Sequence, residues 1–248
     1  MKQIKELESF GKEIKGDLLF DYDLKKKNWF NIGGKAQIYF KPETLNELVL
    51  FLKKFSGEYR IFTLGAGSNI LLTDDKIIGA VIKLGKNFSN ISLLSNEKII
   101  AGSACTDKQV SDFAMENNIG GLEFLSCIPG TIGGGLRMNS GCFGTEFKDI
   151  LLSVQALDKR GNMLTIPSNK INFGYRYSGL DRNLIFLSAS LKGKHKAKNK
   201  IKEEIIFLKD KKSKSQPTKI KTGGSTFKNP INQTKEKVWE LIKKSVPI

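Results

Sequence analysis

Apolar residues near the N-terminus recur at helical spacing. Ile4, Leu7, Phe10 and Ile14 are three or four residues apart and are separated by charged side chains, which predicts an amphipathic helix. Residues 42–55, PETLNELVLFLKKF, repeat the pattern after a threonine and a glutamate with the spacing of a helix N-cap. Further helices are expected over residues 106–118, 198–214 and 234–248.

Alternating apolar and polar residues predict strands between these helices. In residues 183–193, NLIFLSASLKG, four aliphatic positions alternate with Phe186, Ser188 and Ser190, as on a strand with one buried face. Other β-rich runs cover residues 36–40, 60–64 and 77–84, and residues 149–166 predict two strands joined by an Arg-Gly-Asn turn. The mixture predicts an α+β fold without internal repeats.

The composition of the chain bounds its class. A length of 248 residues with 40% hydrophobic content can bury a core in one large domain or two smaller ones. The three cysteines, Cys105, Cys127 and Cys142, lack paired metal-ligand spacing and are interpreted as buried small hydrophobes in a reducing compartment. Because no apolar run has signal-peptide or membrane length, we expect a cytoplasmic protein without a membrane partner.

The formal charge of +16 is concentrated in residues 192–221, KGKHKAKNKIKEEIIFLKDKKSKSQPTKIK. Three interpretations are open: a solvated helix face, an electrostatic funnel for a phosphate-bearing substrate, and a nucleic-acid-binding surface. The block has Phe207 as its one aromatic residue and accompanies no nucleic-acid motif, which argues against nucleic acid as a partner.

Two glycine-rich stretches are candidate anion sites. Residues 64–72, LGAGSNILL, place glycine, serine and asparagine between two β-rich runs, which fits either a hairpin turn or a phosphate cradle. Residues 126–144, SCIPGTIGGGLRMNSGCFG, contain one proline and four glycines within Pro129 to Gly135. Ordering a loop with so many glycines costs much chain entropy, so the glycines are expected to serve a close backbone contact. The amides of the loop could surround a diphosphate.

Two later motifs each have a structural and a functional interpretation. In NFGYRYSG, Arg176 lies between two tyrosines, either stacked on aromatic rings or presented as a planar fork to a carboxylate or oxyanion. In TGGSTFKNP, Ser225 lies between glycines and a Phe-Lys-Asn-Pro tail and is either part of a turn or the working hydroxyl of a site.

These motifs, in this order, resemble the UDP-N-acetylmuramate dehydrogenase (MurB) family. NWFNIGGKAQIYFKP resembles the opening segment of the family, GAGSNILL its first flavin loop and IPGTIGGGLRMNSGCFG its second. FGYRYS resembles its arginine motif and GGSTFKNP its serine motif, so the resemblance covers residues 29–230.

The resemblance implies a fold and a domain division. It implies an α+β chain in which an FAD-binding domain of the vanillyl-alcohol-oxidase/PCMH type, in two subdomains, precedes an incomplete α+β substrate-binding domain. The expected boundaries are a helical N-terminal segment at 1–28, the FAD domain at 29–192 and the shortened substrate domain at 193–248.

The resemblance also implies the chemistry. NADPH reduces a noncovalent FAD, and the flavin passes hydride to the enolpyruvyl group of UDP-N-acetylglucosamine enolpyruvate, which yields UDP-N-acetylmuramate for peptidoglycan. Ser225 is then the proton donor, Arg176 binds and polarises the substrate carboxylate, and a late glutamate shares the stabilisation. A serine is a weak acid, so it must be held against the reacting carbon.

The remaining implied roles concern binding, and the resemblance implies no metal. The residues expected to hold FAD are Asn31, Ile32, Gly33, Gly65, Ala66, Gly67, Ser68, Asn69, Pro129, Gly130, Thr131, Gly133, Gly134 and Gly141. The residues expected to bind the substrate are Tyr175, Gln216, Lys228 and Asn229.

The sequence departs from the family pattern at several positions. Cys127 stands where glycine is common, Gly135 and Ser140 stand where alanines are common, and lysines at 211 and 212 stand where arginines are common. The chain is also expected to stop before the glutamate-bearing segment, since Glu236 and Glu240 match no family motif.

Four functional hypotheses follow. The first is the FAD-dependent reductase, and the second is an FAD-binding remnant that turns over weakly or not at all, unless a separate C-terminal fragment completes it. The third is another oxidoreductase of the same flavin fold, and the fourth is a basic nucleic-acid-binding protein.

Overall fold

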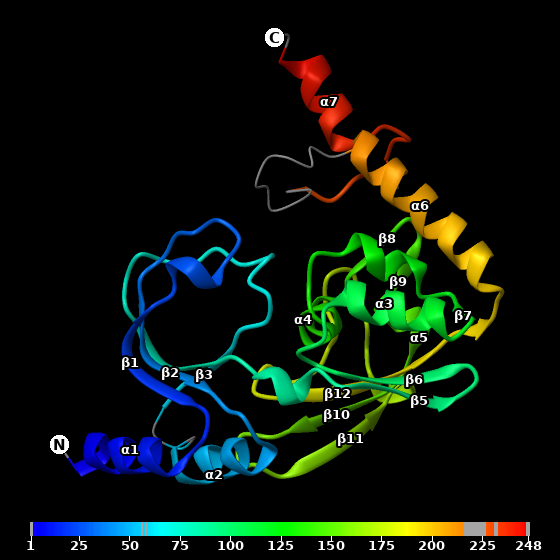
Figure 1. Ribbon diagram of the computed structural model, residues 1–248. Helices are drawn as coiled ribbons and strands as arrows, with labels where there is room; N and C mark the ends of the chain where they lie inside the picture. The colour runs from blue at the N-terminus through cyan, green and yellow to red at the C-terminus, as the bar shows by residue number, and fades with distance from the viewer. Residues whose placement is uncertain (1, 56, 58, 216–226, 231–232, 247–248) are drawn as a thin grey trace.

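Two β-sheets organise the chain (Figure 1) in a computed structural model that describes residues 2–55, 57, 59–215, 227–230 and 233–246. The first sheet has the strand order β1-β2-β4-β3. β1 pairs with β2 in antiparallel register, whereas β4 lies parallel to both β2 and β3. Its strands are β1 (Asp17–Asp23), β2 (Lys35–Lys41), β3 (Ile61–Thr63) and β4 (Ile77–Ile82).

Helices α1 (Lys2–Glu13) and α2 (Leu45–Phe55) pack against the first sheet through an aromatic cluster. Phe10 of α1 contacts Phe40 of β2 and Phe55 of α2 with ring centroids 6.0 and 5.7 Å apart. The predicted cap of α2 is confirmed, because the Glu47 amide donates to Thr44 Oγ1 over 3.2 Å. The buried apolar faces of these helices are those that the sequence periodicity predicts.

The second sheet is antiparallel throughout and has the order β11-β10-β12-β6-β5. Its core contains the inward side chains of β6, β10 and β12 and those of the helices that cover them. The strands are β5 (Ile91–Ser95), β6 (Lys98–Gly102), β10 (Leu151–Leu157), β11 (Met163–Pro167) and β12 (Ile185–Lys192). The covering helices are α3 (Asp107–Glu116), α4 (Ile132–Met138) and α5 (Phe147–Ile150).

Each sheet and its helices form one lobe of the molecule (Figure 1). Helix α6 (Lys198–Ser215) runs along one side of the second lobe, which is built on the five-stranded sheet, and α7 (Val238–Ser245) projects from that side. Ile201, Ile205 and Leu208 of α6 are buried while most of its lysines are exposed, which confirms a solvated basic helix face. Among the described helices, none combines the length and the apolarity needed to cross a bilayer. The short elements are η1 (Lys25–Lys27), η2 (Lys86–Phe88), β7 (Ile119–Gly120), η3 (Glu123–Cys127), β8 (Gly141–Cys142), β9 (Thr145–Glu146), η4 (Ser168–Lys170) and β13 (Lys194–His195).

The structure corrects three expectations of local structure. The segment 1–28 is not helical throughout, because β1 uses its β-rich run DLLFDYD to pair with β2. Residues 70–72 are not a strand, since they form the link from the first glycine loop to β4. Part of the second glycine stretch is helical, because α4 buries Ile132 and Leu136 on one face.

The cysteines have the burial that was expected, with one difference. All three are free thiols, and Cys105 and Cys127 are buried, whereas Cys142 is partly buried. Burial raises the pKa of Cys105 to about 11 and that of Cys142 to about 12. These thiols therefore remain protonated and unreactive at neutral pH.

Candidate active site

Backbone hydrogen bonds join the loop of residues 28–34, called the opening loop here, to the first glycine loop and the residues after it. The Trp29 amide donates to the Gly67 carbonyl over 2.9 Å, and the Gly34 amide donates to Thr73 over 2.7 Å. The buried Asn28 side chain donates to the Ile32 carbonyl over 2.7 Å and so holds the opening loop in shape. Two segments about 40 residues apart in the sequence are thus fixed together by backbone contacts.

Glycine is required where these loops touch. Gly33 has φ +112°, and a Cβ there would lie 2.5 Å from Leu72 Cβ. Gly67 has φ +73°, and a Cβ there would lie 2.3 Å from the Lys27 carbonyl oxygen. Both positions therefore exclude side chains on conformational and steric grounds.

Five consecutive amides of the first glycine loop have no backbone acceptor among the described residues. They belong to Gly65, Ala66, Gly67, Ser68 and Asn69. Successive unpaired N–H groups on a glycine-rich turn form a concave anion site. This arrangement supports the phosphate-cradle interpretation of the loop over the hairpin one.

Lys83 lies beside this loop, directly after β4. Its Nζ atom donates to the Gly65 carbonyl oxygen. Burial, followed by the positive charges of Lys27 and Lys41, lowers the pKa of Lys83. Sequence reasoning missed this residue, although a lysine directly after the apolar run AVI, residues 80–82, was a usable signal.

The second glycine stretch meets the first at Thr131. A Cβ on Gly65 would lie 2.7 Å from Thr131 Oγ1, so the two loops are in contact across the two lobes. Not all amides of the second stretch are available to a ligand, because Ile132 and Gly133 donate theirs to Cys105 and Ser103 over 2.9 and 3.0 Å. This stretch contributes close backbone packing more than a row of free donors.

Asp107 lies under the second stretch and was also missed from the sequence. Its side chain is fully buried, and neither carboxylate oxygen has a hydrogen-bond partner among the described residues. The Asp107 amide donates to Gly130 over 3.2 Å, and a Cβ on Gly130 would lie 2.7 Å from Asp107 Oδ2. Burial raises the pKa of Asp107 to about 8, so this carboxyl group is mostly neutral at pH 7.

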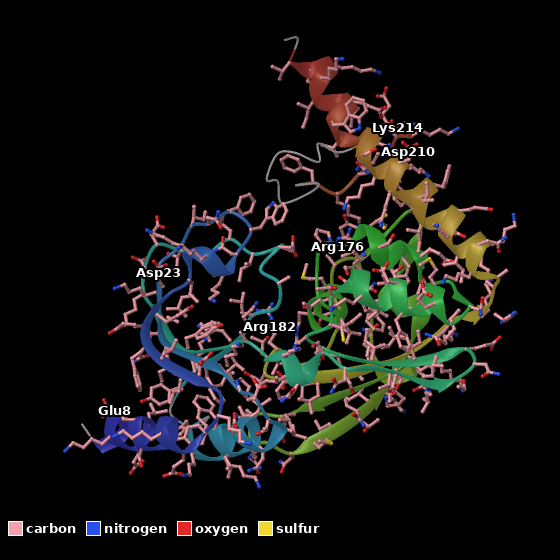
Figure 2. All side chains as sticks on the ribbon, viewed as in Figure 1. Glu8, Asp23, Arg176, Arg182, Asp210 and Lys214 are labelled. Atoms are coloured by element: carbon pink, nitrogen blue, oxygen red, sulfur yellow. The ribbon has the colours of Figure 1, made fainter. Side chains whose placement is uncertain are left out.

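Arg176 occupies a tight two-residue turn. Gly174 and Tyr177 exchange backbone hydrogen bonds of 2.8 and 3.2 Å, and Arg176 has φ +55°. The guanidinium carbon lies 5.1 Å from the centroid of the Tyr175 ring, and Lys228 Nζ lies 5.0 Å from the same centroid. Figure 2 shows Arg176 at the upper edge of the lobe built on the five-stranded sheet. The turn thus gathers two cations around one tyrosine.

Asn139 ties the Arg176 turn to the second glycine stretch. It is fully buried, with φ +41°. Its Nδ2 atom donates to the Gly174 carbonyl and to Glu146 Oε2 over 3.0 Å each, and its Oδ1 accepts from the Lys148 amide over 3.0 Å. An asparagine before Ser-Gly at the end of a helix was the available sequence signal for this left-handed cap.

The other expected residues lie in different settings. Pro129, Asn31 and Ile32 are in exposed or partly exposed loop positions, with Gly134 in the first turn of α4. Gly141 packs in the β8–β9 hairpin, where a Cβ would lie 2.3 Å from the Thr145 carbonyl oxygen. Asn229 Oδ1 accepts from the Val238 amide at the start of α7 over 3.1 Å. Gln216 and Ser225 lie outside the described residues.

Comparison with known proteins gives consistent results. The family described as FAD binding domain matches residues 36–167. The UDP-N-acetylenolpyruvoylglucosamine reductase of Pelagibacter ubique is 62% identical over 245 residues, which are 99% of this chain and 81% of that protein. The protein of the same name from Rickettsia conorii is 45% identical over 232 residues, 94% of this chain and 77% of that protein.

A solved structure has a similar fold. The crystal structure of UDP-N-acetylenolpyruvylglucosamine reductase (MurB) from Thermus caldophilus superimposes with a TM-score of 0.78 at 28% sequence identity. The match covers 94% of this chain and 80% of that one. The two-sheet arrangement around the glycine loops is therefore shared with that protein.

Proposed function

The chain belongs to the UDP-N-acetylenolpyruvoylglucosamine reductase (MurB) family, and from this premise we propose how its residues carry out the family's reaction. The reaction is the NADPH-dependent reduction of UDP-N-acetylglucosamine enolpyruvate to UDP-N-acetylmuramate in peptidoglycan precursor synthesis. The cofactor is FAD. The observation that carries the proposal is the first glycine loop, in which five successive amides have no backbone acceptor among the described residues and Gly65 lies against Thr131 of the second loop.

The residues of these loops fit the diphosphate of FAD. Backbone amides from Gly65 to Asn69 would donate to its oxygens, and the absence of side chains at Gly33 and Gly67 lets the opening loop and the glycine loop pack closely together. The second loop, from Pro129 to Gly134, presents its backbone from the other lobe. When bound, FAD supplies the two-electron chemistry that protein side chains lack.

Arg176 is proposed to bind the substrate carboxylate. Its exposed guanidinium presents a planar fork of donors beside Tyr175. A carboxylate can accept two hydrogen bonds from this fork and carries the opposite charge. Lys228 shares the Tyr175 ring, so it is proposed to hold a second anionic group of the same substrate. The positive charge at Arg176 also stabilises negative charge that develops next to the carboxylate.

Ser225 is proposed to protonate the carbon next to the carboxylate, and Gln216 and Asn229 to contact the nucleotide sugar. These roles rest on the family motif GGSTFKNP and its upstream Gln-Pro pair.

The fold supports an FAD domain over residues 29–192, which contain most of the first sheet and all of the second, and a substrate domain over residues 193–248. We also propose a cytoplasmic location, where NADPH and the nucleotide sugar are present.

The substitutions Arg176→Lys and Arg176→Ala test the carboxylate assignment. Arg176→Ala removes the fork and is expected to lower kcat/KM by about a hundredfold to a thousandfold. Arg176→Lys keeps the charge without the bidentate geometry and should recover part of the loss. Steady-state NADPH oxidation that depends on UDP-N-acetylglucosamine enolpyruvate measures both.

The exposed Arg182 provides a matched control, and Arg182→Ala is expected to leave kcat/KM within about twofold.

The purified protein is expected to be yellow and to release FAD on denaturation. A colourless protein that cannot be reconstituted with FAD contradicts the proposal, and so does an Arg176→Ala variant with unchanged kinetics.

A further inference from the structure

We infer, on the premise of the proposed function, that Lys83 is a cofactor-binding residue whose ammonium group supplies the side-chain charge opposite the diphosphate of FAD. Lys83 lies outside every motif that suggests flavin binding. It differs from the glycine loops in kind, because the loops offer neutral amides and Lys83 offers a full positive charge.

The position of Lys83 brings its charge to the first glycine loop. The residue follows β4, the central strand between β2 and β3, and its Nζ atom donates to the carbonyl of Gly65. Gly65 is the first of the five residues whose amides are unpaired. Since one ammonium group has three donors, two remain for an anion held by these amides.

The charges around Lys83 leave its ammonium group uncompensated. Among the described residues, no carboxylate forms an ion pair with it. In the part of the chain that the structure describes, the charged groups that act on it are Lys27 and Lys41, both cationic. Lys41 has Asp17 as a partner at 3.8 Å, and Lys27 lies 5.4 Å from the centroid of the Tyr22 ring.

A half-buried ammonium group with one carbonyl acceptor and cationic charged neighbours is unfavourable in the protein alone. An anion removes that penalty when it binds, so the same group that weakens the apo-protein strengthens the complex. The diphosphate of FAD has the required charge, and the adjacent amides have the geometry to bind its oxygens. The isoalloxazine and ribityl parts of FAD are uncharged and gain nothing from Lys83.

The test compares FAD with riboflavin, which lacks both phosphates. Apo-protein is titrated with each flavin, and binding is followed by flavin fluorescence. Lys83→Met keeps the length of the side chain without its charge, and is expected to weaken FAD about tenfold to a hundredfold while riboflavin changes less than about twofold. Lys83→Arg retains the charge and should bind FAD within about fivefold of the wild type.

Lys86→Met is the matched control, because Lys86 is exposed on η2 three residues further along the chain. It is expected to bind both flavins as the wild type does. ADP, which carries a diphosphate without a flavin, should protect the wild type against thermal unfolding more than it protects Lys83→Met.

The outcomes separate the inference from the proposed function. Wild-type protein that binds neither flavin contradicts the FAD proposal itself. Wild-type protein that binds FAD, with Lys83→Met binding it equally well, overturns the role of Lys83 alone. A Lys83→Met variant that loses riboflavin and FAD to the same extent also overturns it, because that result assigns Lys83 to the shape of the loop. If Lys83→Met does not fold, the FAD-to-riboflavin preference of Lys83→Gln decides in the same way.

Discussion

At the scale of single residues, the site depends on polar groups that the fold has buried without full compensation. The carboxyl group of Asp107 has no hydrogen-bond partner among the described residues, and the charged groups that act on Lys83 there are cations. Asn139, in contrast, uses both ends of its side chain. Because an uncompensated buried group costs more than a satisfied one contributes, these residues are where substitutions should have their largest and most diagnostic effects.

The buried carboxyl group of Asp107 predicts a pH-dependent stability. Its pKa is raised from an ordinary value near 4 to about 8 by burial, so the native state retains a proton that the unfolded state releases. Its contribution is fully present below the unfolded pKa and is lost as pH rises toward the folded pKa. Between about pH 5 and 7.5, the free energy of unfolding of the wild type should fall relative to that of Asp107→Asn by about 1.4 kcal/mol per pH unit.

Urea denaturation of both proteins at several pH values measures this difference. The asparagine variant keeps the shape of the side chain and cannot ionise, so it isolates the titration of residue 107. Parallel pH profiles for the two proteins contradict a raised pKa at Asp107.

At the scale of elements, Asn139 couples the end of α4 to the Arg176 turn. Asn139→Ala removes three hydrogen bonds and leaves the Gly174 carbonyl and the Lys148 amide without that partner. We expect a loss of about 2–4 kcal/mol in the free energy of unfolding. We also expect a raised KM for the enolpyruvyl substrate, because the turn that presents Arg176 loses its anchor.

The same urea and kinetic measurements on Ser140→Ala give a neighbouring control. Ser140 Oγ has no hydrogen-bond partner among the described residues, so its removal should change stability little. An Asn139→Ala protein as stable as the wild type contradicts the coupling.

At the scale of the whole molecule, the glycine loops of the two lobes touch at Gly65 and Thr131. A cofactor held by loops from both lobes binds only when both are folded and in place. FAD at a hundred times its Kd should therefore raise the free energy of unfolding by about 2.7 kcal/mol. Thermal unfolding at increasing FAD concentrations measures the effect, and a Tm that is independent of FAD contradicts a site of this kind.

Sequence periodicity predicted the elements in which apolar residues recur at regular intervals. Helices α2 and α6 and the strands β10 and β12 fall where apolar spacing predicts them, because each buries apolar residues at regular intervals. The prediction was wrong for β1, because its residues DLLFDYD are mostly exposed and lack a regular alternation of buried and exposed positions. The helical α4 was likewise concealed by its glycines.

The sequence by itself determined the α+β class, the loops able to approach an anion and the motifs that identify the family, because glycine conformation and side-chain chemistry are local properties. Only the tertiary structure decided that Lys83 reaches Gly65, that Asp107 is buried below Gly130 and that Asn139 holds the Arg176 turn. These contacts join residues from 18 to 35 positions apart. The protonation and hydrogen bonding of these side chains depend on how deeply they are buried, and only the folded chain determines that burial.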